Sequence, residues 1–333
     1  MRFATSKRRC CELGQYSGIK QVARLGSASA LLAGMQSYLW SVVLAAGSGR
    51  RLASVTGSTP KQFWRPSGHE SLVEQTLTRL SPLCPADRTV TVVADSQREH
   101  VQDWVAAGTR ARVVFQPDDR GTAAGVLFGL VPVLSADPEA VVLITPSDHG
   151  VGSDDAFRRG ILEAVAHLQH TDSIVLFGVE PSAAQTDYGW ITLAPSEVSA
   201  GVRSVAGFVE KPPAPTARRL LSAGAVWNTM VIVARARTLF RLCRERLPDL
   251  TRVFADCLTL PPGSHEAFLA EQYRHLGAYD FSRDVLAPAQ KLSAYMWPAS
   301  MGWSDLGTPE RLARWLEARS MQDTRLEHAS IAS

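Results

Sequence analysis

Residues 39–52 read LWSVVLAAGSGRRL, an apolar run that passes directly into a glycine-rich loop. The run Leu39–Ala46 is almost entirely apolar, which is typical of a strand covered on both faces of a parallel sheet. The two glycines of the loop allow close approach of a phosphate chain, whose charge the amides and arginines would meet. The loop alone is a weak signal, because it lacks the third glycine of a dinucleotide-binding fingerprint and the Gly-Lys-Ser/Thr of a Walker A loop.

Apolar runs alternate with amphipathic stretches along the rest of the chain. Strands are predicted at 39–46, 89–94, 112–115, 140–145 and 173–179, and helices at 70–80, about 101–105, 121–134 and 156–168. This order predicts an α/β fold with a doubly wound, mostly parallel sheet and helices on both faces. Later strands are predicted at 190–193, 205–209, 226–234 and 292–297, with helices between about 235 and 275 and at 309–318.

We therefore expect one catalytic domain over residues 39–320. Its nucleotide-binding half, 39–180, is fused to a mixed α/β half, 181–320, that binds the second substrate, and residues 321–333 form a tail. Residues 1–38 are expected to be a disordered or spurious extension. Their basic start and short apolar patch faintly resemble a targeting peptide, but the patch is short and the first strand follows closely.

Composition narrows the functional class. Hydrophobic residues make up 45% and charged residues 20% of the 333, as in globular proteins, and no apolar run approaches the roughly 20 residues of a membrane span. The net charge of +3 comes from residues 1–40, where six basic residues and one acidic residue give +5 and leave −2 for the remainder. Nucleic acid is therefore not an expected partner. Five scattered cysteines suggest neither disulfides nor zinc, and favour a reducing cytoplasm.

Polar residues gather where the predicted strands of the first half end, which is where ligands bind in open α/β sheets. Lys61, within TPKQF, is either a phosphate contact or a solvated lysine. Gln116 offers an amide for a base edge, whereas the Gly121-Thr122 pair after it reads equally well as a helix start. Asp148 ends the fourth strand, where it would hold Mg²⁺ or form an Asx-turn.

The second half carries a matching set of polar positions. Glu210 and Lys211 are expected to point to opposite sides of an extended chain, so that one grips sugar hydroxyls and the other meets a phosphate. A surface ion pair is the plainer alternative. Asn228, after Trp227, offers an amide beside an aromatic platform. Asp305, in GWSDLG, would be a second metal carboxylate.

The motifs together are more specific than any one of them. Read in order, the chain contains LAAGSGRRL, PKQF, QPDDRGTA, PSDH, YGW, FVEKP, WN and GWSDLG. This series resembles the sugar-nucleotidyltransferase superfamily and, within it, the mannose-1-phosphate guanylyltransferase branch. The likeness runs from about residue 40 to 318 and implies a Rossmann-like nucleotidyltransferase fold.

The resemblance implies a transfer from a nucleoside triphosphate, GTP in this branch, to a sugar 1-phosphate, mannose 1-phosphate in this branch, with Mg²⁺ as cofactor. Catalytic roles are implied for Arg51, Lys61 and Lys211. Nucleotide binding is implied for Gly47, Ser48, Gly49, Arg50, Gln116, Gly121 and Thr122. Sugar binding is implied for Tyr188, Gly189, Glu210, Asn228 and Asp284, and metal binding for Asp148 and Asp305.

Three positions depart from the family pattern. Arg50 stands where a small residue is usual, Ala124-Gly125 replaces a more usual Pro-Ala, and Thr229-Met230 follows Trp-Asn where Ser-Gly is common. The last change affects the wall of the expected sugar pocket. Another hexose 1-phosphate or another nucleoside triphosphate is therefore an alternative pair. A catalytically silent sensor of nucleotide sugars is an alternative of another class, although both lysines and both aspartates are present.

Overall fold

The computed structural model describes residues 38–66, 68–102, 104, 112–199 and 201–331. The account below concerns the compact unit that begins at Leu39. The expected N-terminal extension therefore lies outside the described residues, apart from Tyr38. Within the part of the chain that the structure describes, no helix combines the length and apolar character needed to cross a bilayer.

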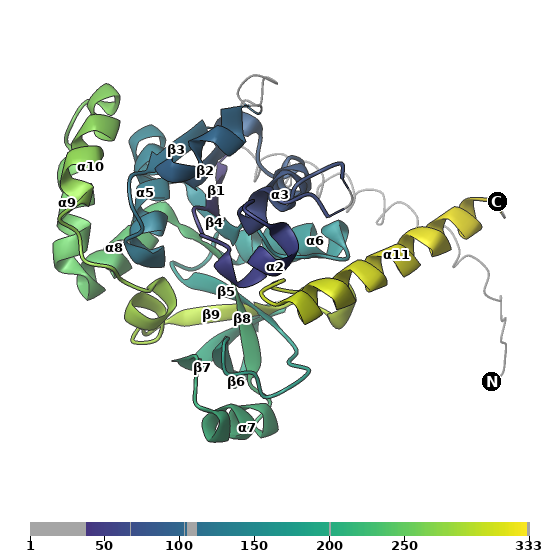
Figure 1. Ribbon diagram of the computed structural model, residues 1–333. Coiled ribbons are helices and arrows are strands. Elements are labelled where there is room, and N and C mark those ends of the chain that lie inside the picture. The colour runs from purple at the N-terminus through teal and green to yellow at the C-terminus, as the bar shows by residue number, and fades with distance from the viewer. Residues whose placement is uncertain (1–37, 67, 103, 105–111, 200, 332–333) are drawn as a thin grey trace, which may run out of the picture. The chain divides into compact units, whose positions relative to one another are not determined.

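Nine strands and nine α-helices make up the described unit (Figure 1). The strands are β1 (Leu39–Ala45), β2 (Thr89–Ala94), β3 (Arg112–Gln116), β4 (Val141–Pro146), β5 (Ile174–Val179), β6 (Gly189–Ser199), β7 (Val202–Glu210), β8 (Val226–Arg235) and β9 (Leu292–Met296). The helices are α2 (Ala53–Thr56), α3 (Leu72–Leu80), α5 (Gly121–Ala136), α6 (Asp154–His167), α7 (Ala214–Ser222), α8 (Ala236–Arg246), α9 (Pro248–Leu258), α10 (His265–Tyr273) and α11 (Pro309–Ile331).

The strands form one sheet in the order β3-β2-β1-β4-β8-β5-β9-β7-β6. β1 pairs in parallel with both β2 and β4, so the chain order reverses between β1 and β4. β8 pairs antiparallel with β4 and β5 on its two sides, and also with β6, while β5 and β9 are parallel. Of the nine described strands, only β7 and β8 run against the other seven. The predicted doubly wound, mostly parallel α/β architecture is confirmed.

Strands of the second half complete a closed circuit. β6 pairs with β7 and also with β8, so β8, β5, β9, β7 and β6 join into a ring. β5, from the first half, lies between β8 and β9 of the second half. The two halves expected from the sequence thus share one sheet. Figure 1 shows the β6–β7 hairpin and α7 standing below the main sheet.

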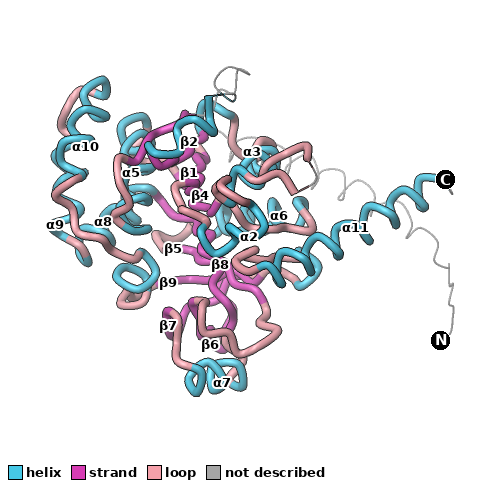
Figure 2. Tube along the Cα trace, viewed as in Figure 1, coloured by secondary structure: helices cyan, strands magenta, loops and turns pink. Residues whose placement is uncertain are grey.

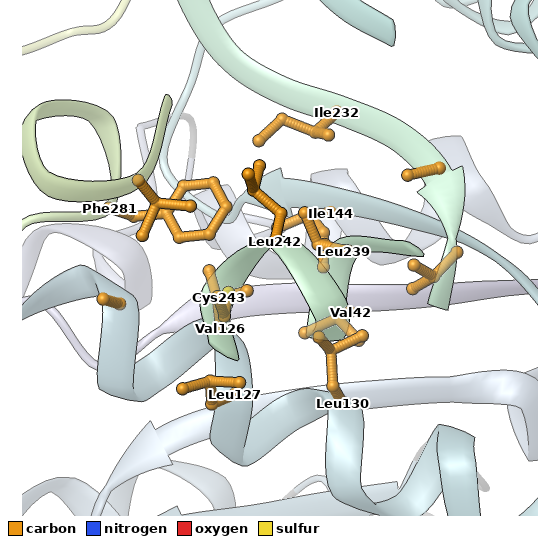
Figure 3. Close-up of a cluster of buried hydrophobic side chains, with 14 of the residues drawn as sticks. Val42, Val126, Leu127, Leu130, Ile144, Ile232, Leu239, Leu242, Cys243 and Phe281 are labelled. Carbon is orange, nitrogen blue, oxygen red and sulfur yellow. The ribbon is translucent and has the colours of Figure 1, made fainter. Parts of the chain in front are cut away.

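Helices cover both faces of the sheet, as Figure 2 shows with cyan helices flanking the magenta strands. On one face, α5 and α8 pack on the strands through buried residues. Figure 3 shows Val42, Ile144 and Ile232 of three adjacent strands against Val126, Leu127 and Leu130 of α5 and Leu239, Leu242 and Cys243 of α8. On the other face, Phe157 of α6 stacks on Trp297 with ring centroids 5.0 Å apart. The residues of α5 are almost all apolar, because this helix is buried on nearly all sides.

Several elements differ in extent from the sequence prediction, among them β6, which continues to Ser199 and does not end near residue 193. α11 begins at Pro309 as predicted but continues to Ile331, through most of the stretch expected to be a tail. Of the helix predicted near residues 101–105, Gln102 and Trp104 are helical and follow a 3₁₀ segment, Asp95–Val101, while Asp103 and Val105 lie outside the described residues. α3 begins close to its predicted start because Ser71 and Glu74 form a capping box.

Candidate active site

A cavity of about 510 Å³ opens at the carboxyl ends of β1 and β4, where the strand order reverses. This is the place where open α/β sheets bind ligands. Five residues singled out from the sequence line it, namely Gly47, Gln116, Gly121, Thr122 and Asp148. Residues from β8 and from the segment before β9 close the far wall, so the cavity is shared by both halves of the domain.

The two glycines of the first loop serve different purposes. A side chain at Gly47 would meet no atom within 4 Å, so this glycine leaves the cavity open. Gly49 has φ +63°, and a Cβ there would lie 2.6 Å from the Lys61 backbone nitrogen. Gly49 is therefore needed for close packing of the loop on the PKQF segment, in a backbone conformation that glycine adopts most easily.

The remaining loop residues are more exposed. Ser48 and Arg50 are exposed and lie outside the cavity lining. The Arg51 side chain is 72% exposed, and its Nη1 is 4.0 Å from Asp187 Oδ2. Leu52, which stands in place of a third glycine, is buried in a cluster with Leu306. That cluster holds the glycine-rich loop beside the GWSDLG segment.

Lys61 is the most buried charge of the site, at 5% exposed. Its Nζ lies 3.1 Å from Asp148 Oδ2 and donates a 2.5 Å hydrogen bond to the backbone oxygen of Asp305. Burial opposes ionisation of Asp148, but the Lys61 ammonium outweighs it and keeps the pKa of the carboxyl below its usual value. One ammonium thus joins the two aspartates that the resemblance assigns to metal.

Gln62 was missed by the sequence reasoning although PKQF was noticed. Its amide nitrogen donates to the backbone oxygens of Ala45 and Gly47, both at 2.8 Å, and it lines the cavity. Gln62 therefore fastens the lysine segment to the end of β1. In the sequence, the signal for this role was a glutamine directly after the phosphate-type lysine, because an amide that becomes buried there needs hydrogen-bond partners.

The carboxylate of Asp305 is held by two other side chains. Tyr188 Oη donates to Oδ1 at 2.8 Å, and Arg311 Nη1 lies 3.0 Å from Oδ2. Burial, together with Asp305, raises the pKa of the Tyr188 phenol. Arg311 also forms a bidentate pair with Asp187 at 2.8 and 3.0 Å, and its guanidinium lies over the Tyr188 ring. Arg311 lies in the first turn of α11 and could not be assigned from sequence.

These contacts bear on the expected Mg²⁺ site. Asp148 lines the cavity and one third of its side chain is exposed, so it suits a cation that also binds phosphate oxygens and water. Asp305 fits less well in this arrangement, because Arg311 and Tyr188 occupy both of its carboxylate oxygens. Within the described ranges, no group of three or more His, Cys, Asp or Glu side chains is placed to hold a metal.

His149 is a neutral partner of Trp303. Burial lowers the pKa of His149 to about 4. The ring is therefore uncharged at neutral pH, and its Nδ1 accepts a 3.2 Å hydrogen bond from Trp303 Nε1. This contact ties the PSDH segment to the GWSDLG segment beside Asp148.

Three of the five predicted sugar-binding residues, Gly189, Glu210 and Asn228, meet in a second cluster. Gly189 pairs with Glu210 across β6 and β7, and a Cβ at Gly189 would lie 2.6 Å from Glu210 Oε2 and 3.3 Å from Asn228 Cβ. Glu210 Oε2 is buried and has no hydrogen-bond partner among the described residues. Burial raises the pKa of Glu210, with the Lys211 hydrogen bond opposing it.

Lys211 does not point away from Glu210, and that sequence expectation was wrong. Its φ is +44°, so the chain leaves the extended conformation in which neighbours alternate. Lys211 Nζ lies 3.1 Å from Glu210 Oε1 and 3.9 Å from Asp280 Oδ2. Because Asp280 lines the cavity, Lys211 connects the second cluster to it.

Asp280, four residues before the predicted sugar-binding Asp284, lines the cavity, and Asp284 does not. Asp284 accepts a 2.8 Å hydrogen bond from the Asp280 backbone and pairs with Arg283. Asp280 accepts from Arg283 N as an N-terminal cap, a preference by which sequence alone could have singled it out. Thr122 lies in the first turn of α5, where the helix-start reading placed it, and its hydroxyl accepts a 2.8 Å hydrogen bond from Phe281 N, which joins α5 to the same segment.

Gln116 and Gly121 line the part of the cavity nearest α5. Gln116 is 4% exposed and donates to the backbone oxygen of Asp118 at 2.9 Å. A Cβ at Gly125 would lie 3.2 Å from Gln116 Oε1, so glycine there leaves room for this amide. Gly121 has φ +77°, and its Cβ would lie 2.3 Å from the Tyr279 backbone oxygen. Both glycines therefore allow backbone and side chains to approach closely.

Comparison with known proteins gives a consistent family. The family model described as nucleotidyl transferase matches residues 40–320. A mannose-1-phosphate guanylyltransferase of Escherichia coli (strain K12) is 26% identical over 82% of this chain and 59% of its own length. The alginate biosynthesis protein AlgA of Pseudomonas aeruginosa is 28% identical over 80% of this chain and 56% of its own length. The chain thus spans less than two thirds of the length of these relatives.

Solved structures give the same picture. A Thermus thermophilus protein named mannose-1-phosphate geranyltransferase superposes with a TM-score of 0.71 at 30% identity, over 81% of this chain and 76% of that one. A UDP-glucose pyrophosphorylase complexed with UDP-glucose superposes with a TM-score of 0.55 at 15% identity, over 86% of this chain and 98% of that one. The second likeness is one of fold.

Proposed function

This chain belongs to the nucleotidyl transferase family, and we propose that it transfers a nucleotidyl group from a nucleoside triphosphate to a sugar 1-phosphate, with release of pyrophosphate. We propose GTP and mannose 1-phosphate as the substrates and GDP-mannose as the product. Relatives named for this reaction, at 26% identity over most of this chain, support the choice. The 30% identical Thermus thermophilus structure, also named for mannose 1-phosphate, supports the sugar.

One structural observation carries the proposal. Lys211 links Asp280 of the cavity wall to Glu210, whose buried Oε2 lacks a hydrogen-bond partner among the described residues. An orphaned buried acceptor is costly unless a ligand donor satisfies it, and sugar hydroxyls are suitable donors. A nucleotide in the cavity and a sugar at Glu210 would lie on either side of Lys211 and Met230.

The charges suit a reaction between two anions. An oxygen of the sugar phosphate attacks the α-phosphorus in line, a new P–O bond forms, and the bond to the β-phosphate breaks as pyrophosphate leaves. Lys211 would hold the attacking phosphate, while Lys61 and Arg51 would meet the charge of the triphosphate. No general base is required, because a phosphate monoester has its second pKa near about 6 and is largely ionised at neutral pH.

We propose Mg²⁺ as the cofactor, which Asp148 would hold, with Asp305 as the candidate second ligand. When bound, the cation would supply positive charge to phosphate oxygens. Lys61 touches both aspartates and so would keep them in register whether or not the cation is present.

Pyrophosphate release tests the proposal. Purified protein with Mg²⁺ is assayed over a grid of nucleoside triphosphates and sugar 1-phosphates, and release is expected with GTP and mannose 1-phosphate. Pyrophosphate release with another pair would support the proposed type of reaction but contradict the proposed substrates. If folded protein that binds GTP releases no pyrophosphate with any pair, the proposed enzymatic activity would be refuted and a nucleotide-sugar sensor favoured.

Asp148→Asn should lower turnover by about 10²-fold or more, the scale expected for loss of a preorganised electrostatic group. Asp249→Asn is the matched control, because Asp249 is an exposed carboxylate in a surface ion pair with Arg252. Turnover that is equal in the two variants would contradict the role of Asp148.

A further inference from the structure

β8 contains a bulge beside the cavity. The pairing of β5 with β8 passes from Leu176↔Ile232 to Gly178↔Asn228, so three residues of β8 lie opposite the single residue Phe177. The Thr229 hydroxyl stabilises the bulge, since it donates to the Phe177 backbone oxygen at 2.8 Å and accepts from Val231 N at 3.3 Å. Bulges of this kind redirect a side chain next to a binding site.

Met230 is the residue that this bulge redirects. Its φ is +60°, a left-handed conformation that glycine adopts readily and a longer side chain adopts only at a cost. Its backbone nitrogen donates to Asn228 Oδ1 at 3.3 Å, which helps to hold that conformation. Four non-glycine residues of the described chain have positive φ. Lys211, Met230 and Leu306 belong to the site or adjoin it, and Lys291 does not.

Concentration of backbone strain at a site points to a role for the side chains held there. The Met230 side chain lines the cavity, and Ser282 Oγ lies 3.5 Å from its Sδ. It is thus anchored between β8, which carries Asn228, and the segment that carries Asp280. This is where the cavity meets the cluster around Glu210.

We propose that Met230 is a specificity-determining residue that limits the size of the sugar 1-phosphate. The inference rests on the proposed function and names the substrate class of the same site. In this proposal the space beside the thioether accepts an unsubstituted hexose 1-phosphate, and the acetamide of an N-acetylhexosamine 1-phosphate is the added bulk that Met230 would exclude. The apolar thioether is also a poor partner for the acetamide N–H and carbonyl, so both size and polarity oppose that substrate.

The test compares kcat/KM for mannose 1-phosphate with kcat/KM for N-acetylmannosamine 1-phosphate and N-acetylglucosamine 1-phosphate, with GTP as the common donor. Met230→Gly should raise the ratio of N-acetylated to plain substrate by about tenfold or more, the scale on which an apolar pocket discriminates a small group. Met230→Gln keeps the length of the side chain and should leave the ratio nearer to that of the wild type. Met296→Ala is the matched control, because Met296 packs against the core from β9 and does not line the cavity.

Folding gives an independent readout. Met230→Gly should unfold at a denaturant concentration at least equal to that of Met230→Ala, because glycine relieves the positive φ and alanine retains it. A wild type that uses N-acetylated and plain substrates equally, or a Met230→Gly ratio within about twofold of wild type, would overturn the inference and leave the proposed function standing. A wild-type protein without activity on any of the sugar phosphates would overturn both this inference and the proposed function.

Discussion

Replacement of Lys61 by methionine removes one charge from the most buried ion pair of the site and keeps the apolar stem. In the wild type, Nζ lies 3.1 Å from Asp148 Oδ2 and 2.5 Å from the Asp305 backbone oxygen. The variant loses both contacts. The Asp148 carboxylate then keeps its charge beside a methyl group, and the Asp305 carbonyl loses a donor.

The size of the effect follows from distance and burial. At 3.1 Å and an effective dielectric constant of about 20, the attraction is about 5 kcal/mol. The net loss is smaller, because the ammonium no longer has to be desolvated, and removal of one partner of a fully buried pair costs about 3–5 kcal/mol. Asp148 is 33% exposed, so water can solvate the remaining charge in part. We expect Lys61→Met to lower the free energy of unfolding by about 2–3 kcal/mol.

Urea unfolding of a double-mutant cycle measures this directly. Lys61→Met, Asp148→Asn and the double variant are unfolded in the presence of a chelator, so that no added cation contributes. The coupling energy between the two positions should be about 1–2 kcal/mol. Lys291→Met, at an exposed lysine, is the control for loss of charge alone. A loss below about 0.5 kcal/mol for Lys61→Met, or a coupling energy near zero, would refute the assigned ion pair.

Three further outcomes are expected. Gly121→Ala should lower the free energy of unfolding by about 2 kcal/mol or more, because φ is +77° and the new Cβ would lie 2.3 Å from Tyr279 O. Gly224→Ala, where φ is +72° but the new Cβ would meet open space, should lower the free energy of unfolding by less. Burial opposes ionisation of Glu74, but hydrogen bonds from Ser71 outweigh it, so the pKa of this carboxyl is lowered. Glu74→Gln should therefore cost about 1 kcal/mol at pH 7 in thermal or urea unfolding, and this difference should be lost as the pH falls through the lowered pKa of the folded state. Glu210→Gln should raise KM for the sugar phosphate more than KM for the nucleotide, and equal effects would contradict its role at the sugar.

The expected family was predictable because its motifs are local. The end of a strand is recognisable in the sequence as an apolar run followed by glycine or polar residues, as at Ala45–Gly47 and Pro146–Asp148. The family match over residues 40–320 confirms the superfamily read from these motifs. Roles of the individual site residues stay predictions, which the variants above address.

Contacts between distant segments were not predictable in the same way. Strand pairing depends on closure of long loops, so periodicity does not reveal that β8 lies between β4 and β5. Nor does it reveal that Arg311, in the last helix, holds Asp305. The expectation for Lys211 failed for a related reason, because alternation assumes an extended backbone and the tertiary fold imposes φ +44°.

The amino-acid sequence by itself determined most of the strands and helices, although not α7, and it also determined where phosphate-type charges and small residues lie and to which superfamily the chain belongs. These properties follow from local periodicity and from residue chemistry. Only the tertiary structure decided that one buried ammonium joins Asp148 to Asp305, that Asp280 rather than Asp284 lines the cavity, and that Met230 turns into it. Those outcomes depend on long-range pairing and packing, which place side chains that are far apart in the chain within a few ångströms of one another.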